Sequence, residues 1–239
     1  MVLNELIQRS PIRIFEKSIQ GGLKPGELGV IASPSGIGKT SVLVQIALDK
    51  LLQGKKVIHI SFTQHTDYVL AWYEDIFDEF IRKKNLENEQ DVKDDIVKNR
   101  VLMKFNQEGL TVDQILKSLK ALIKDGGFNV DSVIIDGFDF TLAGESHIPG
   151  VKAFALEMGI SIWYSCTVKG EGPFYDKRNI PQVIKDYAEH FGVIIILDPR
   201  PDHIALTVSR DRDAGDLAHL ALKLDPKTLL ILEKSTTPP

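Results

Sequence analysis

The sequence predicts an α/β protein whose core is a mainly parallel, twisted sheet flanked by helices, with antiparallel strands added toward the C-terminus. Three observations support this fold class. Short apolar, β-branched runs alternate with amphipathic helical patterns over most of the chain. A glycine-rich loop joins the first such run to the first clear helix. Beyond residue 192, strand-like runs follow one another with only turns between them.

The expected core alternates strands and helices in chain order. Apolar side chains at helical spacing predict a helix over residues 39–52, which Gly54 ends. Thr111 is a good N-cap for a helix over residues 111–124, and Gly126 with Gly127 would stop it. We expect further strands over residues 28–32, 56–62, 100–105, 132–136 and 160–166, further helices over residues 66–84, 151–158 and 181–191, and a solvated helix and turn in the charged segment 85–99.

The C-terminal part has a different pattern, in which turns alone separate the apolar runs. It predicts strands over residues 193–197, 203–209, 218–224 and 229–232, which would extend the parallel core in antiparallel fashion. The final residues 235–239 read STTPP and predict a frayed end. No low-complexity linker divides the sequence, so we expect a single domain over residues 1–239.

Composition limits the classes of protein that this chain can represent. The 239 residues include 43% hydrophobic and 26% charged residues, with a net charge of −4. These values are typical of a globular protein and exclude a strongly basic nucleic-acid coat. Cys166 is the single cysteine, which excludes an intrachain disulfide and favours a reducing compartment. No apolar run is long enough to cross a membrane, so we expect a soluble, cytoplasmic protein without membrane contact.

The strongest chemical signal is the loop SPSGIGKT at residues 33–40. It follows an expected strand and opens an expected helix, which is the setting in which a P-loop binds phosphate through its backbone N–H groups. The expected nucleotide-binding residues are Ser35, Gly36, Ile37, Gly38, Lys39, Thr40 and Ser41. Lys39 would reach the β- and γ-phosphates, and the Thr40 hydroxyl would bind Mg²⁺. Ser33 stands where the pattern has glycine, so an incidental glycine-rich turn is the alternative.

A carboxylate completes the expected magnesium site. Asp136 ends the apolar strand 132–136, about 100 residues after the loop. Ligands of parallel sheets bind at the carboxyl ends of the strands, where Asp136 would face Thr40. We therefore expect Thr40 and Asp136 to hold Mg²⁺, with ATP as the nucleotide. The alternative is an ordinary aspartate at a strand end.

The stretch GGLKPGELGVIASPSGIGKT, residues 21–40, resembles the opening of RecA/KaiC-like ATPases. Its matching lead-in residues are Gly21, Gly22, Leu23, Gly26 and Glu27. The resemblance implies a RecA-like P-loop core and a homo-oligomer, often a hexameric ring, that binds ATP between neighbouring subunits. It also implies a basic pair that reaches the neighbour's γ-phosphate, and Arg210 and Arg212 stand in that place. An ordinary surface pair, balanced by the aspartates at 211 and 213, is the equal alternative.

The glutamates that activate water in this family align with Thr63 and Gln64. Neither side chain is an effective general base, although Gln64 could orient a water molecule and is the remaining catalytic candidate beside the arginines. Cys166 ends the strand on which relatives place a phosphate-sensing side chain, and we expect it to be a buried residue rather than a nucleophile. The resemblance with these substitutions implies ATP binding with weak or absent hydrolysis, in a regulatory or signalling role.

Two alternative functions are also compatible with the sequence. A DNA-dependent recombinase or helicase-type ATPase is one alternative, because the loops 141–150 and 168–180 occupy the positions where recombinase relatives contact DNA; the chain's acidity disfavours it. An assembly module that has lost nucleotide binding is the other. The aromatic residues Tyr68, Trp72 and Tyr73 of the helix 66–84 predict a core face, with a surface for an unidentified protein partner as the less favoured interpretation.

Overall fold

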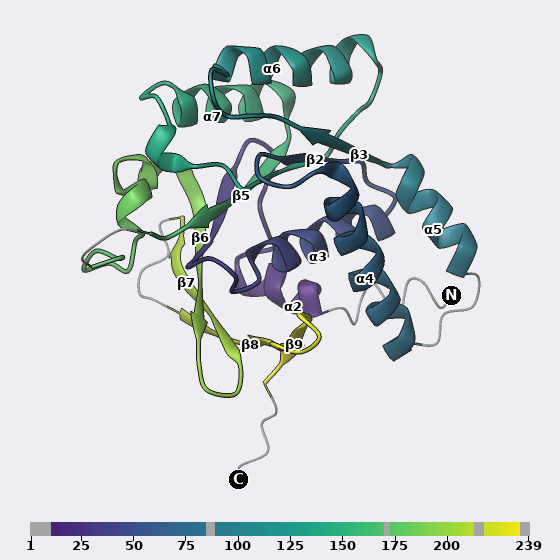
Figure 1. The fold of residues 1–239 in the computed structure, drawn as a ribbon, viewed down its shortest axis with the longest axis vertical. Coiled ribbons are helices and arrows are strands. Elements are labelled where there is room, and N and C mark those ends of the chain that lie inside the picture. The colour runs from purple at the N-terminus through teal and green to yellow at the C-terminus, as the bar shows by residue number, and fades with distance from the viewer. Residues whose placement is uncertain (1–10, 85–88, 170–172, 213–217, 235–239) are drawn as a thin grey trace.

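The structure is a computed structural model that describes residues 11–84, 89–169, 173–212 and 218–234. Its centre is one nine-stranded sheet with the strand order β3-β2-β4-β5-β1-β6-β7-β8-β9 (Figure 1). The expected fold class, a mostly parallel α/β sheet flanked by helices and extended by antiparallel strands, is confirmed. The predicted frayed end, residues 235–239, lies outside the described residues.

The parallel part of the sheet brings the important strand ends to one edge. It contains β1 (Leu28–Ser33), β2 (Val57–Ser61), β3 (Arg100–Lys104), β4 (Ser132–Asp136), β5 (Ser161–Thr167) and β6 (Phe191–Pro199). Strand β5 lies between β1 and β4, in register with both through Ser33↔Thr167 and Ile135↔Tyr164. The carboxyl ends of these three strands therefore line a single crevice.

The C-terminal strands continue the sheet in antiparallel fashion. They are β7 (Ile204–Asp211), β8 (Ala218–Leu224) and β9 (Ile231–Glu233). The first of the four expected C-terminal runs, β6, also pairs in parallel with β1, so it joins the two parts of the sheet. The last expected strand begins two residues later than predicted, because Leu229 adopts a left-handed turn with φ 55°.

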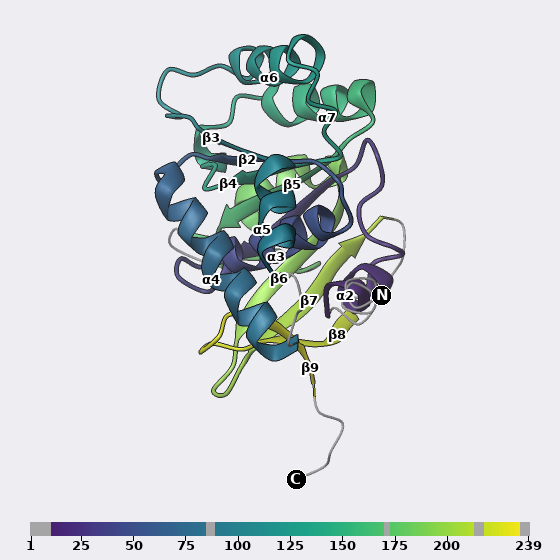
Figure 2. The ribbon, with the colours of Figure 1, turned by 90° about the vertical axis from the view of Figure 1, so that its right-hand side faces the viewer.

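Helices cover both faces of the sheet (Figure 2). One face carries α2 (Pro11–Ser18), α3 (Lys39–Leu52), α4 (Thr66–Lys84) and α5 (Glu89–Lys98), and the other carries α6 (Val112–Lys120) and α7 (His147–Met158). Side chains of β1 alternate between the faces: Ile31 packs under α3, whereas Val30 packs toward α7. None of the helices in the described ranges is both long and apolar enough to span a bilayer.

Several helical details differ from the sequence predictions. Helix α2 was not predicted, although Pro11 at its first position is a standard helix start. Helix α7 begins at His147 rather than at residue 151, since Pro149 lies in the first turn, where no backbone N–H is needed. Helix α6 continues as a π-helical turn over Ala121–Asp125. The segments Phe140–Leu142 and Gln182–His190 form 3-10 helices.

Candidate functional site

The predicted phosphate loop connects β1 to α3 in the arrangement that anion binding requires. Gly38 is the N-cap of α3 and has φ 106°, which only glycine adopts without strain. A Cβ at Gly38 would also lie 2.6 Å from Cδ2 of Leu224 on β8, so that leucine side chain would have to shift to admit it. The loop can therefore present its backbone N–H groups and the N-terminus of α3 to an anion.

Lys39, the first residue of α3, folds back over the loop. Its Nζ donates hydrogen bonds to the carbonyl oxygens of Ser33 (3.1 Å) and Pro34 (2.8 Å). Burial lowers the pKa of Lys39, and the nearby Asp136 carboxylate opposes this effect. A cation held on neutral carbonyls would gain from a negatively charged ligand, so the position of Lys39 fits phosphate binding.

Thr40 and Asp136 meet across the crevice. The Thr40 Oγ1 donates a hydrogen bond of 2.8 Å to Oδ2 of Asp136. Two oxygen ligands at this distance suit a magnesium ion that takes its other ligands from phosphate and water. No group of three or more acidic, histidine or cysteine side chains that could hold a metal occurs among the described residues. The donor set therefore fits Mg²⁺ bound together with a nucleotide better than a site built from protein ligands alone.

These residues line a cavity of about 520 Å³ at the carboxyl edge of the sheet. Six of the seven predicted nucleotide-binding residues line it: Ser35, Gly36, Gly38, Lys39, Thr40 and Ser41. The side chain of Ile37 instead packs against the apolar core, which leaves its backbone N–H as the group available to a phosphate. Ser41 Oγ donates to the carbonyl of Leu229, so the C-terminal segment is attached to α3 beside the loop.

Ser33 does not obstruct the cavity. Its side chain is fully buried, and its Oγ donates a hydrogen bond of 2.9 Å to the carbonyl of Pro34. Its backbone carbonyl accepts hydrogen bonds from Lys39 and from the N–H of Val168. The serine at the customary glycine position therefore stabilises the loop through hydrogen bonds and does not enter the cavity.

Thr63 and Gln64 line the cavity at the end of β2, where the family resemblance places glutamates. Thr63 contacts Gly137 so closely that a Cβ on that glycine would lie 2.4 Å from Thr63 Oγ1. The Gln64 backbone N–H donates to Ser61 Oγ, whereas its side-chain Oε1 is buried without a hydrogen-bond partner among the described residues. Gln64 thus places an unsatisfied acceptor beside the phosphate loop.

Asp139 and Lys169 also line the cavity, and the sequence analysis did not assign either to the nucleotide site. Lys169 Nζ lies 2.6 Å from Asp139 Oδ2. The side chain of Gln107 fixes the Asp139 backbone through two hydrogen bonds of 2.8 Å. Partial burial acts to raise the pKa of Asp139, but the hydrogen bonds from Lys169 and Thr141 together outweigh it and hold the pKa below its ordinary value. Asp139 closely follows the end of β4, and Lys169 closely follows the end of β5. These positions in the sequence were the signal that could have assigned both residues to the site.

The aromatic residues of α4 divide between three environments. Tyr73 is buried in the core, as the core-face interpretation requires, and its hydroxyl lies 3.1 Å from Nδ1 of His59. Trp72 lines the cavity, a role that the sequence analysis did not assign to it. Tyr68 is 69% exposed. Helix α4 therefore contributes to both the core and the candidate nucleotide site.

The two predicted arginines lie at the opposite edge of the sheet from the phosphate loop. Arg212 adopts a left-handed conformation just beyond β7, so it does not continue the strand alternation with Arg210. Its guanidinium pairs with both carboxylate oxygens of Glu27, at 2.8 and 2.6 Å, and donates to the carbonyl of Gly22. Arg210 is half-buried, and its Nε has no hydrogen-bond partner among the described residues. Within one chain, neither arginine approaches Lys39 or Thr40.

The remaining predicted features have structural explanations. Cys166 is buried on β5, and burial raises the pKa of its thiol to about 12. In the loop 168–180, of which residues 170–172 lie outside the description, Lys169 and Arg178 pair with Asp139 and Asp176. These pairs reduce the positive charge that a DNA-binding loop would offer.

Residues 3–149 match the model of the AAA domain family, which covers more than half of the chain and includes the phosphate loop and Asp136. A search of curated proteins found no match. The matched region supplies the loop, the lysine and the strand-end aspartate that a phosphate site needs. The chain therefore belongs to the AAA domain family, a group of P-loop ATPase-like, nucleotide-binding proteins.

Proposed function

We propose that this protein is a RecA/KaiC-like member that binds ATP with Mg²⁺, hydrolyses it slowly or not at all, and uses nucleotide binding in a regulatory or signalling role. The observation that carries the proposal is the 2.8 Å contact between Thr40 and Asp136 in a cavity whose water-activating positions hold Thr63 and Gln64. The lead-in at residues 21–27 supports the narrower family assignment.

The binding half of the proposal rests on the phosphate loop. The backbone of residues 35–38 and the ammonium of Lys39 would hold the phosphates, and Thr40 with Asp136 would hold Mg²⁺. When bound, the metal ion would neutralise charge on the β- and γ-phosphates. Lys39 would exchange its hydrogen bonds with the Ser33 and Pro34 carbonyls for contacts to phosphate oxygens. Trp72 and Leu229 would exclude water from the walls of the cavity.

The lack of an available base supports slow hydrolysis. Among the described residues, the carboxylates that line the cavity are Asp136 and Asp139. Asp136 is committed to Thr40, and Asp139 has a lowered pKa because Lys169 binds it. A carboxylate that is held in its ionised form by a cation is a weak proton acceptor, and losing a positioned base costs roughly 10²–10⁴-fold in rate.

The homo-oligomer expected from the resemblance remains part of the proposal. A head-to-tail ring joins two different faces of the subunit, so a residue far from its own phosphate loop could serve its neighbour. Arg210 is the better candidate for that role, because Arg212 is held by Glu27 and the carbonyl of Gly22.

Calorimetric titration with ATP, in the presence and absence of Mg²⁺, tests the proposal together with a phosphate-release assay. We expect binding that Mg²⁺ strengthens, loss of binding in Lys39→Ala, and turnover near the background rate. A Gln64→Glu variant offers a carboxylate at the cavity and should raise turnover without changing affinity more than a few-fold. Absence of binding at millimolar ATP would reject the proposal, and rapid turnover by the unmodified protein would reject its second half.

A further inference from the structure

Among the described residues, two lysines line the nucleotide cavity, and they are held in different ways. Lys39 is 8% exposed, and its Nζ donates hydrogen bonds to the carbonyl oxygens of Ser33 and Pro34. The side chain of Lys169 is 53% exposed, and its Nζ lies 2.6 Å from Oδ2 of Asp139. The proposed function uses Lys39 to hold the phosphates, but it gives no role to the ion pair of Lys169.

Strand order places Lys169 beside the start of the phosphate loop. Strand β5 lies between β1 and β4, and its last residue, Thr167, is in register with Ser33. The N–H of Val168 donates to the carbonyl of Ser33 (3.0 Å), which also accepts from Nζ of Lys39 (3.1 Å). Lys169 is therefore attached next to the carbonyl that holds the Lys39 ammonium. The terminal phosphate of a nucleotide held by the loop would lie at this strand end.

The position of Asp139 does not depend on its contact with Lys169. The Asp139 backbone N–H and carbonyl both bond to the side chain of Gln107, at 2.8 Å each. Its Oδ1 accepts from the N–H and the hydroxyl of Thr141 (3.0 and 2.7 Å), which caps the 3-10 helix Phe140–Leu142. The ion pair with Lys169 uses the other carboxylate oxygen, Oδ2. Asp139 can therefore release the lysine and keep the bonds that position it.

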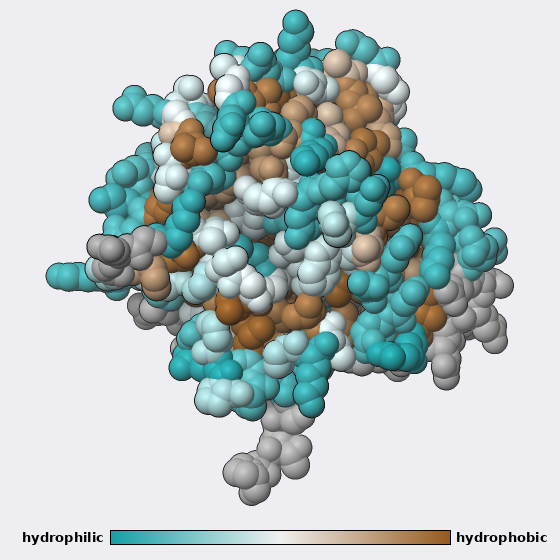
Figure 3. All heavy atoms as spheres, in the orientation of Figure 1, coloured by the Kyte–Doolittle hydropathy of each residue, from teal (hydrophilic) through white to brown (hydrophobic). Residues whose placement is uncertain are grey.

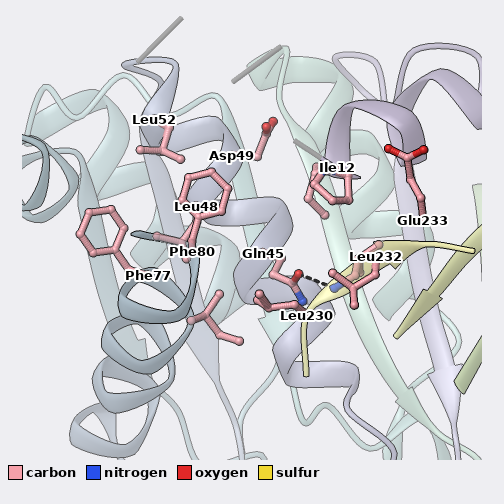
Figure 4. Close-up of a pocket in the computed structure, with 13 residues that line it drawn as sticks. Ile12, Gln45, Leu48, Asp49, Leu52, Phe77, Phe80, Leu230, Leu232 and Glu233 are labelled. Carbon is pink, nitrogen blue, oxygen red and sulfur yellow. Dashed lines mark hydrogen bonds between the residues drawn. The ribbon is translucent and has the colours of Figure 1, made fainter. Parts of the chain in front are cut away.

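The wall of the cavity that contains Leu229 is fixed more firmly than the ion pair of Lys169. The Leu229 carbonyl accepts hydrogen bonds from the side chains of Ser41 and Gln45. The buried Gln45 in turn accepts from the N–H of Ile231 (2.8 Å; Figure 4). Lys169, by contrast, carries its charge on a flexible stem, and water weakens an exposed ion pair of this kind. Lys169 can therefore change its partner at little cost.

The present partner of Lys169 is an anion at neutral pH. Partial burial acts to raise the pKa of Asp139, but the hydrogen bonds from Lys169 and Thr141 hold that pKa below its ordinary value. Hydrophilic residues cover most of the face drawn in Figure 3, and its apolar residues lie in separate patches, so water competes for exposed charges there. A ligand that takes Lys169 from Asp139 must therefore offer more negative charge than one carboxylate, as a terminal phosphate does.

We propose that Lys169 selects for the γ-phosphate of ATP, and that Asp139 competes with this phosphate for the lysine. The inference rests on the proposed nucleotide function and adds the residues that distinguish a triphosphate from a diphosphate. When ATP binds, the Lys169 ammonium leaves Oδ2 of Asp139 and donates to an oxygen of the γ-phosphate. ADP has no such phosphate, so the ion pair stays closed when ADP binds.

Calorimetric titration with ATP and with ADP, both in Mg²⁺, tests the proposal through two variants of opposite expected effect. Lys169→Ala should weaken ATP binding about tenfold and ADP binding less than about twofold. Asp139→Asn keeps an oxygen for Thr141 but removes the competing charge, so it should strengthen ATP binding about two- to fivefold. The matched control is Arg178→Ala, which removes a positive charge from the same loop. Arg178 is 72% exposed in its side chain and pairs with Asp176, so the control should leave both affinities unchanged.

A double variant separates competition from simple repulsion between Asp139 and the nucleotide. In the Lys169→Ala background, competition predicts that Asp139→Asn no longer strengthens ATP binding, because there is no lysine to release. If the gain persists in that background, Asp139 acts by repulsion and the proposal is wrong. The ADP affinity that each variant retains shows that its phosphate loop is folded.

Two further results would overturn the proposal. Equal losses of ATP and ADP affinity in Lys169→Ala would show that the lysine does not recognise the γ-phosphate. Weaker ATP binding by Asp139→Asn would show that the ion pair organises the site rather than competing with the ligand. If the unmodified protein bound neither nucleotide, the proposed function would fail as well. If it bound ATP but the ratio of ATP to ADP affinity were the same in all variants, only the present proposal would fail.

Discussion

The contact between Gly137 and Thr63 offers a sharp test of the site geometry. Gly137 follows Asp136 and has φ 76°, and a Cβ there would lie 2.4 Å from Thr63 Oγ1 and 2.8 Å from its Cγ2. Gly54, at the end of α3, has nearly the same backbone angle (φ 74°) but no atom within 4 Å of its Cβ position. Alanine at the two positions therefore meets the same backbone strain but different surroundings.

The expected magnitudes follow from these two differences. Left-handed backbone costs an ordinary residue about 1–2 kcal/mol. Overpacking adds about 1–3 kcal/mol where a neighbour must move. Gly54→Ala should therefore lower the free energy of unfolding by about 1–2 kcal/mol, and Gly137→Ala by about 2–5 kcal/mol.

Urea denaturation without nucleotide measures both variants, and a double-mutant cycle with Thr63→Ala isolates the contact. Because Thr63→Ala removes the two closest atoms, it should recover about 1–2 kcal/mol of the loss in Gly137→Ala and nothing in Gly54→Ala. Equal losses in the two glycine variants, together with additivity in the cycle, would show that Thr63 does not lie against Gly137.

Three further predictions concern charged side chains. Burial raises the pKa of Asp49 from 3.8 to about 6, despite its pairing with Arg13, so the stability that its protonation confers is present below pH 3.8 and is lost as pH rises through 6. Asp49→Asn should therefore remove about 2–2.5 kcal/mol of decline in unfolding free energy between pH 4 and pH 7. An unchanged pH profile would contradict the burial argument. Arg212→Ala should lower the free energy of unfolding by about 2–4 kcal/mol, because it leaves the half-buried Glu27 without its guanidinium partner. If the variant had native stability, the Arg212–Glu27 pair would not be structural. Lys169→Ala should weaken ATP binding about tenfold in calorimetry, and its free energy of unfolding should stay within about 0.5 kcal/mol of that of the unmodified protein. Unaltered ATP affinity would show that Lys169 is not part of the site.

Local patterns were sufficient to predict most of the elements. Helix α3 has the predicted bounds, 39–52, because both its apolar spacing and the glycines on either side are local signals that can be recognised within a short stretch of sequence. The alternation of strands and helices also predicted a mostly parallel sheet. Helix α2 was missed because it is only eight residues long, and its stability comes from packing of Phe15 and Ile12 against the core.

The parts of the site that depend on strand order could not be predicted. Nothing local indicates that β5 lies between β1 and β4, which is what brings Lys169 and Asp139 to the cavity. The pairing of Arg212 with Glu27 joins residues 185 positions apart, so spacing alone left an interface role equally open. Long-range contacts of this kind are decided by topology, whereas motifs such as the phosphate loop are decided by neighbouring residues.

The central claim is that this protein holds ATP and keeps it intact. The most direct measurement is to incubate the protein with ATP and Mg²⁺ for several hours, remove unbound nucleotide by rapid gel filtration, and identify the retained nucleotide by chromatography, with Lys39→Ala in parallel. Our account predicts that the unmodified protein retains ATP and that Lys39→Ala retains no nucleotide. Retention of ADP, or equal retention by the two proteins, would contradict it.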